Sequence, residues 1–162
     1  RAFSASAGIS LEMAKQFMDQ YFTHYSGVAR FIEQAKRSAT QLGFAQTLLG
    51  RKRFLPDLYS THPMLRSAAE RMAQNMPTQG LQSDIIKLAM IQIFYQLMPR
   101  YGDKIRLLLQ IHDELVFEIA DPVVSELVPQ IKQAMESCFS LKIPLVVEVK
   151  SGKNLGEMVS FG

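Results

Sequence analysis

His112, Asp113 and Glu114 place an imidazole and two carboxylates side by side between two apolar runs. The runs, residues 105–111 and 115–119, are strand-length and rich in branched side chains, which predicts an antiparallel hairpin with polar residues at its tip. Adjacent carboxylates at a rigid turn repel each other unless a cation neutralises them, and hard divalent cations take oxygen ligands. The tip therefore fits a metal site. It also fits a plain turn, since Asp favours turns, and the pattern alone leaves both interpretations open.

A second candidate site is a row of long hydrogen-bond donors. Arg71 and Asn75 are spaced i, i+4 on one face of an expected helix, and Gln79 continues the row if Pro77 does not turn the chain away. Such a row suits the minor groove of a duplex, where acceptor atoms occur at every base pair, so that duplex shape is checked without reading the sequence. A solvated helix face is the alternative explanation.

A third candidate is a basic turn with Arg51, Arg53 and the aromatic Phe54, which could contact phosphates. It lies in a basic stretch, because residues 30–71 contain eight Lys or Arg against three Asp or Glu, a net charge of +5. Residues 100–148 contain five basic and eight acidic residues, a net charge of −3. This order suits a polyanion with bound cations, although charge runs are also common on solvated surfaces.

The composition is that of one globular domain. The 162 residues are 48% hydrophobic and 20% charged with a formal net charge of +3, which allows a buried core and argues against a disordered tail. No apolar run reaches the roughly 18 residues that a transmembrane helix needs. The single cysteine, Cys138, excludes an internal disulfide framework and a Cys-based zinc site. Glycine-rich phosphate-binding loops are missing from the sequence.

Apolar periodicity and capping residues predict the elements that must position these candidates. The expected helices cover residues 9–25, 27–41, 63–76, 79–98 and a stretch that begins at 121–122, and a short hairpin covers 44–55. Ser10 is expected to cap the first helix and Gly43 to end the second. Thr61 is expected to cap the third and Pro77 to interrupt it.

The long helix is expected to be the buried spine of the domain. Between residues 85 and 98 its apolar positions surround almost the whole cylinder, so neighbours must cover most of its sides. Residues 144–149 are predicted to form a last strand. The fold class that follows is α+β, with helices packed on a small antiparallel sheet and without repeats or linkers.

Four segments resemble conserved motifs of family A DNA polymerases, the bacterial DNA polymerase I type. They are Gln-Ile-His-Asp-Glu-Leu-Val-Phe-Glu at 110–118, Ala-Glu-Arg at 69–71 with Asn75 and Gln79-Gly80, Thr-Leu-Leu-Gly-Arg-Lys-Arg-Phe-Leu-Pro-Asp at 47–57, and Pro-Leu-Val-Val-Glu-Val at 144–149 with Gly152. They occur in the family's order and at nearly its spacing, so the resemblance spans essentially the whole chain.

The resemblance implies DNA-directed DNA synthesis, in replication or repair, by two-Mg²⁺ in-line displacement with primer–template DNA and dNTP as partners. Asp113 matches a catalytic carboxylate that holds the metal, and Glu114 matches its neighbour, which tunes the metal or positions the primer end. His112 matches a residue near the primer terminus. Residues 71, 75 and 79 match primer–template contacts.

The two Mg²⁺ ions also need a carboxylate from a second strand. In the family this strand lies upstream, as does the nucleotide-binding helix, and no segment here matches either. We therefore expect residues 1–162 to be a C-terminal part of a polymerase domain, inactive alone, with the upstream palm, fingers and thumb as partners. The whole would be part of a polymerase palm with the rear of the fingers. About 1–76 would form the fingers side with the basic hairpin, and about 77–162 would form the palm with the His-Asp-Glu hairpin.

The chain departs from the family pattern at Leu81-Gln82-Ser83, where small residues are commoner, and at Leu155, where Trp is usual. Either departure could alter packing. Two other functions remain open: a non-catalytic module that binds primer–template duplex, and a metal-dependent nuclease that uses Asp113 and Glu114. The expected location is intracellular, in a bacterial cytoplasm or else an organelle or nucleus, with no membrane partner.

Overall fold

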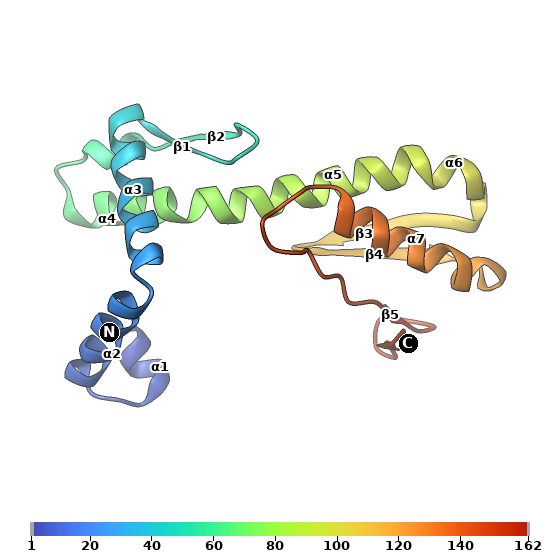
Figure 1. Cartoon of the computed structure of the whole chain (residues 1–162), viewed down its shortest axis with the longest axis horizontal. Helices are drawn as coiled ribbons and strands as arrows, with labels where there is room; N and C mark the ends of the chain where they lie inside the picture. Colours follow the sequence, from blue (N-terminus) through green and yellow to red (C-terminus); the bar gives the residue numbers. More distant parts are fainter. Residues whose placement is uncertain (1, 162) are drawn as a thin grey trace. The chain divides into compact units, whose positions relative to one another are not determined.

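The computed structural model describes residues 2–161, which form two compact units that adjoin in sequence between Gly80 and Leu81 (Figure 1). Arg1 and Gly162, the ends of the expected domain, lie outside the described residues. The described part of the chain consists of helices and of two-stranded antiparallel sheets, which confirms the predicted α+β class. Within residues 2–161, no helix is both long enough and apolar enough to cross a bilayer.

The first unit is mainly helical. Its elements are α1 (Ala2–Ala7), α2 (Leu11–His24), α3 (Ser26–Leu42), β1 (Phe44–Gln46), β2 (Lys52–Phe54), the 3₁₀ helix η1 (Pro56–Tyr59), α4 (Pro63–Asn75) and the π-helix η2 (Met76–Gly80). The hairpin β1–β2 is shorter than the predicted 44–55 but has the predicted place, with Phe44 opposite Phe54.

Small side chains build the core of the first unit. The buried residues that pack together come from α3, β1, α4 and the segment around η1: Ala39, Ala45, Leu55, Leu58, Ala69 and Ala73. Because most of them are Ala, the backbones of α3, β1 and α4 approach closely. The hydroxyl of Tyr59 donates to the Thr40 carbonyl oxygen at 2.6 Å and ties η1 to the end of α3.

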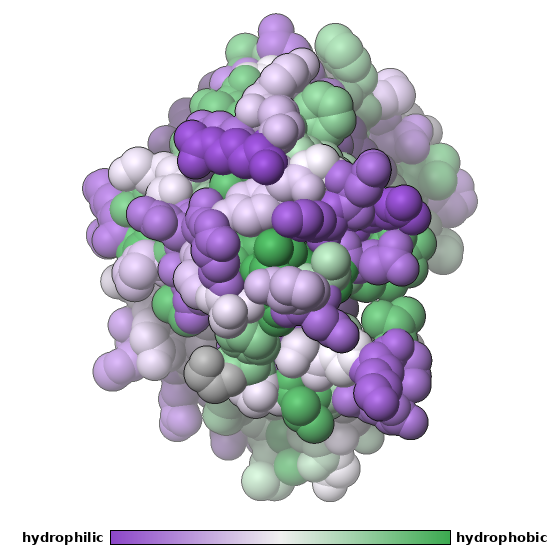
Figure 2. All heavy atoms as spheres, turned by 90° about the vertical axis from the view of Figure 1, so that its right-hand side faces the viewer, coloured by the Kyte–Doolittle hydropathy of each residue, from purple (hydrophilic) through white to green (hydrophobic). Residues whose placement is uncertain are grey.

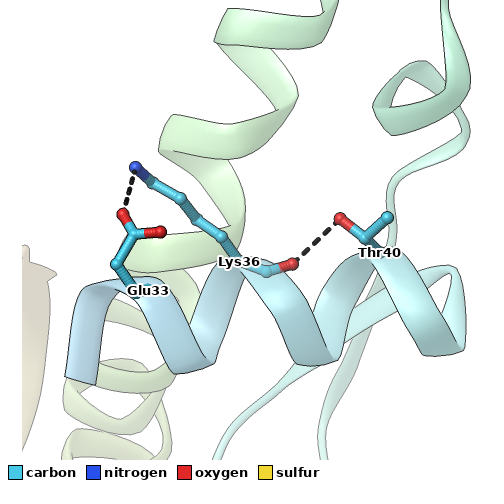
Figure 3. Close-up of polar contacts among 3 residues, drawn as sticks. All are labelled: Glu33, Lys36 and Thr40. Atoms are coloured by element: carbon cyan, nitrogen blue, oxygen red, sulfur yellow. Dashed lines mark hydrogen bonds and ion pairs between the residues drawn. The ribbon is translucent and has the colours of Figure 1, made fainter. Parts of the chain in front are cut away.

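Polar contacts along α3 are exposed to solvent (Figure 3). Lys36 Nζ lies 3.3 Å from Glu33 Oε1, and Thr40 Oγ1 donates to the Lys36 carbonyl oxygen at 3.0 Å. An exposed ion pair of this kind contributes less than about 1 kcal/mol. Ala39 on the same helix is buried in the core of the unit and is therefore more important for the placement of α3.

The helix ends confirm two predicted caps and correct a third. Ser10 Oγ accepts from the Met13 N–H at 3.1 Å, and Gly43 ends α3 in the left-handed conformation with φ 76°. The prediction that Thr61 caps α4 is wrong, because the N-cap is His62, without a side-chain cap bond. The physical reason is Pro63, whose fixed φ suits the first helical position and makes the residue before it the cap.

Replacing Gly43 by Ala tests the left-handed cap. An L side chain at φ 76° costs about 1–2 kcal/mol, so we expect Gly43→Ala to lower the free energy of unfolding by that amount. Gly27→Ala is the matched control, because Gly27 lies in α3 with open space where the Cβ would be. There Ala stabilises the helix by up to roughly 0.5–1 kcal/mol. Urea unfolding midpoints that move the same way for both variants would contradict this account.

Pro77 interrupts the α-helix as predicted, since α4 ends at Asn75, but the helical path continues through it. Residues 76–80 continue it as the π-helix η2, in which each hydrogen-bonded turn is one residue wider than in an α-helix. A proline within an α-helix lacks an N–H donor and clashes with the carbonyl four residues earlier. The wider turn relieves that clash, which explains why the helix deforms at Pro77 instead of stopping.

The second unit contains the predicted carboxylate hairpin. Its elements are α5 (Leu81–Gln96), α6 (Met98–Tyr101), the 3₁₀ helix η3 (Gly102–Lys104), β3 (Ile105–Ile111), β4 (Glu114–Ile119), the 3₁₀ helix η4 (Asp121–Val123), α7 (Val124–Ser137), β5 (Lys150–Ser151) and β6 (Val159–Ser160). α7 packs on α5, and both contribute to one core with the hairpin (Figure 1). Ile93, Ile105 and Leu127 are its most completely buried large side chains.

A hydrogen-bond network joins α6 to α7 beside this core. The Tyr101 hydroxyl donates to Glu126 Oε1 and accepts from Gln130 Nε2, both at 2.7 Å. The hydrogen bond to the Glu126 carboxylate raises the pKa of Tyr101, because ionising the phenol would remove the proton that it donates. The network fixes the turn that leads into β3.

The expectation that α5 is covered on most sides is wrong for the described residues. Ile86, Ala89 and Ile93 are buried, but Ile91, Phe94 and Tyr95 are more than half exposed. On the face drawn in Figure 2, hydrophobic side chains likewise reach the surface among hydrophilic ones. One side of α5 packs in this unit, and its other side is an exposed apolar face of a kind that usually contacts a partner.

The predicted last strand at residues 144–149 is also absent from the described structure. This segment forms no strand pairing, and among the described residues the pairing that follows it joins β5 to β6. The N–H of Val147 instead donates to Glu136 Oε1 at 2.8 Å. A strand requires a neighbour for its ladder bonds. At the end of this segment the Phe161 N–H donates to the Val149 carbonyl oxygen at 2.9 Å, but within the described residues no strand pairs with the segment, and Val146 is exposed.

Candidate functional site

The β3–β4 hairpin positions the three residues that first suggested chemistry. Ile111 pairs with Glu114, so His112 and Asp113 form a two-residue turn and Glu114 is the first residue of β4. His112 has φ 53°, a conformation that costs a non-glycine residue free energy. Its carbonyl oxygen accepts from Gln110 Nε2 at 2.7 Å, which helps to hold the turn.

A bulge in β3 decides which face of the hairpin each side chain occupies. The register shifts between Leu107 and Leu109, where β3 has one residue more than β4. Before the shift, Leu107 pairs with Phe117 on the face that packs on the core. After it, Leu109 and Ile111 share the opposite face with Glu114, since directly paired residues lie on one face.

Both carboxylates at the tip are exposed. Glu118, further along β4, lies 3.7 Å from Arg106, whereas Asp113 and Glu114 at the turn are open to solvent. Exposed carboxylate oxygens suit a hard cation such as Mg²⁺. However, no group of three or more His, Cys, Asp or Glu side chains within residues 2–161 could hold a metal ion. The donor set fits part of a metal site, which further ligands must complete.

The predicted donor row lies on one exposed surface of the first unit. Arg71, Asn75 and Gln79 are all exposed, while Ala69 and Ala73 on the other side of α4 are buried in the core. The Arg71 guanidinium donates to Ser67 Oγ at 2.9 Å, one turn earlier on the same helix. The structure thus places the three donors along α4 and η2, where they are accessible to a ligand.

The basic turn lies beside this row. Arg53 Nη2 lies 3.3 Å from Met72 Sδ, which brings β2 against the α4 residue that follows Arg71. Lys52 faces the other way, with its Nζ 4.5 Å from the centre of the Phe44 ring. The exposed Arg51 side chain belongs to the turn that joins β1 to β2. The first unit therefore presents Arg53 and the donor row together.

The remaining expectations concern Cys138 and the positions where the chain departs from the family pattern. Cys138 is not expected to be catalytic, and burial raises the pKa of its thiol, which favours the unreactive protonated form. Of the unusual residues 81–83, Gln82 is exposed, and Ser83 Oγ accepts from Lys87 Nζ at 3.2 Å. Leu155 is exposed as well.

Sequence reasoning missed one contact. Gly80 lies directly against the buried Thr47, so two of the quoted motifs touch in the folded chain. Adjacent motifs in sequence give no direct signal of this packing.

Comparison with known proteins identifies the family. The sequence model of DNA polymerase family A matches residues 1–157. Thermostable DNA polymerase I of Thermus filiformis is 40% identical over 151 residues, which are 93% of this chain and 18% of that protein. DNA polymerase I of Caldicellulosiruptor bescii is 42% identical over 149 residues, 90% of this chain and 17% of that protein.

A solved structure agrees. The POL domain of Pol1 from M. smegmatis, in complex with DNA primer-template and dNTP, matches with a TM-score of 0.82 and 40% identity. The match covers 88% of this chain and 25% of that one. The chain spans less than a fifth of the curated relatives quoted above. From the family match and these similarities, the chain belongs to DNA polymerase family A.

Proposed function

We propose that this chain works within a longer protein as the C-terminal part of a DNA-directed DNA polymerase domain. The observation that carries the proposal is the two-residue turn with an exposed Asp113 beside Glu114, in a chain that the family model matches almost throughout. The M. smegmatis relative was solved with primer-template DNA and dNTP, which supports the same partners here. Synthesis of this kind serves DNA replication and repair.

Asp113 is the proposed Mg²⁺ ligand, together with a carboxylate upstream of this chain. When bound, two Mg²⁺ ions would activate the primer 3′-hydroxyl and stabilise the leaving pyrophosphate. Glu114 would tune that site or position the primer end, and His112 would lie near the primer terminus. The paired strands on either side of Asp113 and the hydrogen bond from Gln110 to the turn support this assignment, because a metal ligand must be held in a fixed position.

The donor row is the proposed contact with the primer–template duplex. Arg71, Asn75 and Gln79 are exposed along one surface and would bond the acceptor atoms of the minor groove. Arg51 and Arg53 would contact phosphates, which adds affinity without sequence preference. Such contacts hold a duplex of any sequence, as a general polymerase requires.

The rest of the polymerase is the proposed partner of the exposed apolar faces. Phe94 and Tyr95 on α5, and Leu109 and Ile111 on β3, leave apolar area open that an upstream palm strand and its neighbours would cover. We propose a division into a fingers side, about 1–76, and a palm, about 77–162, and the boundary between the two compact units at Gly80 and Leu81 supports it. A DNA substrate and bacterial relatives support an intracellular location, in a bacterial cytoplasm.

Primer extension tests the function. The longer polymerase should extend a primer on a template with four dNTPs and Mg²⁺, and EDTA should abolish extension because the displacement needs the metal. Duplex binding without extension under any metal would contradict the proposal and support a non-catalytic binding module. Metal-dependent cleavage of DNA without nucleotides would support a nuclease instead.

A further inference from the structure

Gly80 and Thr47 approach each other more closely than any side chain at position 80 would allow. A Cβ atom added to Gly80 would lie 2.6 Å from Thr47 Cγ2, and 2.9 Å from the Cε of Met76. Met76 can move, since this is the end of a flexible side chain. Thr47 is only 3% exposed and is held at the start of the basic turn. Its N–H donates to the Arg51 carbonyl oxygen at 3.0 Å, and its Oγ1 accepts from the Arg51 N–H at 3.3 Å. Only a glycine lets η2 lie this close to the turn.

η2 also determines where Gln79 points. In an α-helix four residues exceed one turn by about 40°, so a row at i, i+4, i+8 drifts around the helix. In a π-helix each turn holds more residues. The four residues from Asn75 to Gln79, which cross η2, therefore make nearly one whole turn. The π-turn brings Gln79 into line with Asn75, and the position of η2 on Thr47 fixes that alignment.

We propose that the Gly80–Thr47 contact is a positioning contact for duplex recognition. It holds η2 against the basic turn, so that Gln79 stays aligned with Asn75 and continues the donor row that begins at Arg71. This inference rests on the proposed function, because it assumes that the donor row binds primer–template. Thr47 and Gly80 themselves do not touch the DNA in this account, and they act only through Gln79.

The first variant, Gly80→Ala, adds a Cβ atom at position 80. Gly80→Ala must push η2 away from Thr47, which turns Gln79 out of line. In the longer polymerase we expect a rise in KM and Kd for primer–template of roughly 3–10-fold, the scale of one hydrogen bond lost, with kcat almost unchanged. Gly27→Ala is the control for the same chemical change in open space, and its KM should equal that of the wild type.

A compensating substitution at Thr47 then separates a positioning effect from a general loss of structure. Thr47→Ser removes Cγ2 but keeps the Oγ1 that accepts from Arg51, so it leaves room for the methyl group that Gly80→Ala adds. The double variant Thr47→Ser with Gly80→Ala should restore KM to that of Thr47→Ser alone. A KM that stays high in the double variant would overturn the proposal, and so would a Gly80→Ala polymerase with unchanged KM.

Gln79→Ala supplies the readout that a merely structural contact would not move. Gln79→Ala should raise KM for primer–template when it is made in the wild type. In the Gly80→Ala background it should raise KM no further, and in the double variant it should again raise KM by its full wild-type factor. Full additivity in every background would overturn the proposal. If Gly80→Ala alone does not fold, the double variant provides the test. A double variant that folds and has the KM of Thr47→Ser supports the contact. A double variant that folds but has a higher KM contradicts it. A wild-type enzyme that neither binds nor extends primer–template would instead contradict the proposed function.

Discussion

Asp113→Ala in the longer polymerase is expected to lower kcat for primer extension by at least about 10²–10³-fold. This is the scale for removing one fixed group that stabilises charge in a transition state. Ala keeps the two-residue turn possible but removes the carboxylate that would hold Mg²⁺. Single-turnover extension with saturating primer–template and dNTP measures the chemical step without a contribution from binding.

Glu118→Ala is the matched control for Asp113→Ala. Glu118 is an exposed carboxylate on the same hairpin, and its pair with Arg106 is worth at most about 1 kcal/mol. Its loss should leave kcat within about twofold of the wild type, a change in barrier well below 1 kcal/mol. Equal extension by wild type and Asp113→Ala would remove Asp113 from the metal site while leaving polymerisation established.

Leu127→Ala should give the largest loss of stability among the substitutions considered. Leu127 is fully buried in α7, in the core that α5 and the hairpin share. Removing it leaves a cavity, and such changes cost about 2–5 kcal/mol. The temperature at which the polymerase loses half its extension activity should fall by several degrees, because each kcal/mol moves the midpoint by roughly 2–4 °C.

Leu155→Ala is the control for Leu127→Ala, since the same atoms are removed from an exposed side chain. It should change that temperature by no more than about 2 °C, as expected for a surface substitution. Equal losses for the two variants would show that the core around α7 does not limit the stability of the polymerase. Activity at low temperature should be normal in both, because neither residue lies at the proposed site.

Local signals predicted the elements that depend on neighbours in sequence. Ser10 and Gly43 are helix caps as predicted, because capping depends on a few adjacent residues. The carboxylate hairpin was predictable because two apolar runs flank a polar tip. The exposure of Arg71 and Asn75 followed from helical spacing. Family membership followed from four short motifs in order.

The errors arose where the outcome depends on distant contacts. The interruption at Pro77 was predicted, but its form, a π-helix that continues the helical path, was not. The apolar positions of α5 predicted burial on most sides, yet Phe94 and Tyr95 are exposed in the described residues. The 144–149 segment has the composition of a strand but forms no strand pairing within residues 2–161. Composition indicates that a surface is apolar, but not which part of a longer chain covers it.

Because of the bulge, the two parts of β3 have different neighbours. Leu107, before the bulge, faces the core, so a substitution there is limited by volume and by the cost of a cavity. Leu109, two residues later, faces the side of Glu114, where the neighbour is the surface around the turn. Simple strand alternation would place Leu107 and Leu109 on the same face, but because of the bulge these two positions tolerate different replacements. Loss of the bulge with all residues of β3 retained would exchange these faces beyond it, so substitutions that straighten β3 at Leu108 are expected to turn Leu109 and Ile111 away from the side of Glu114.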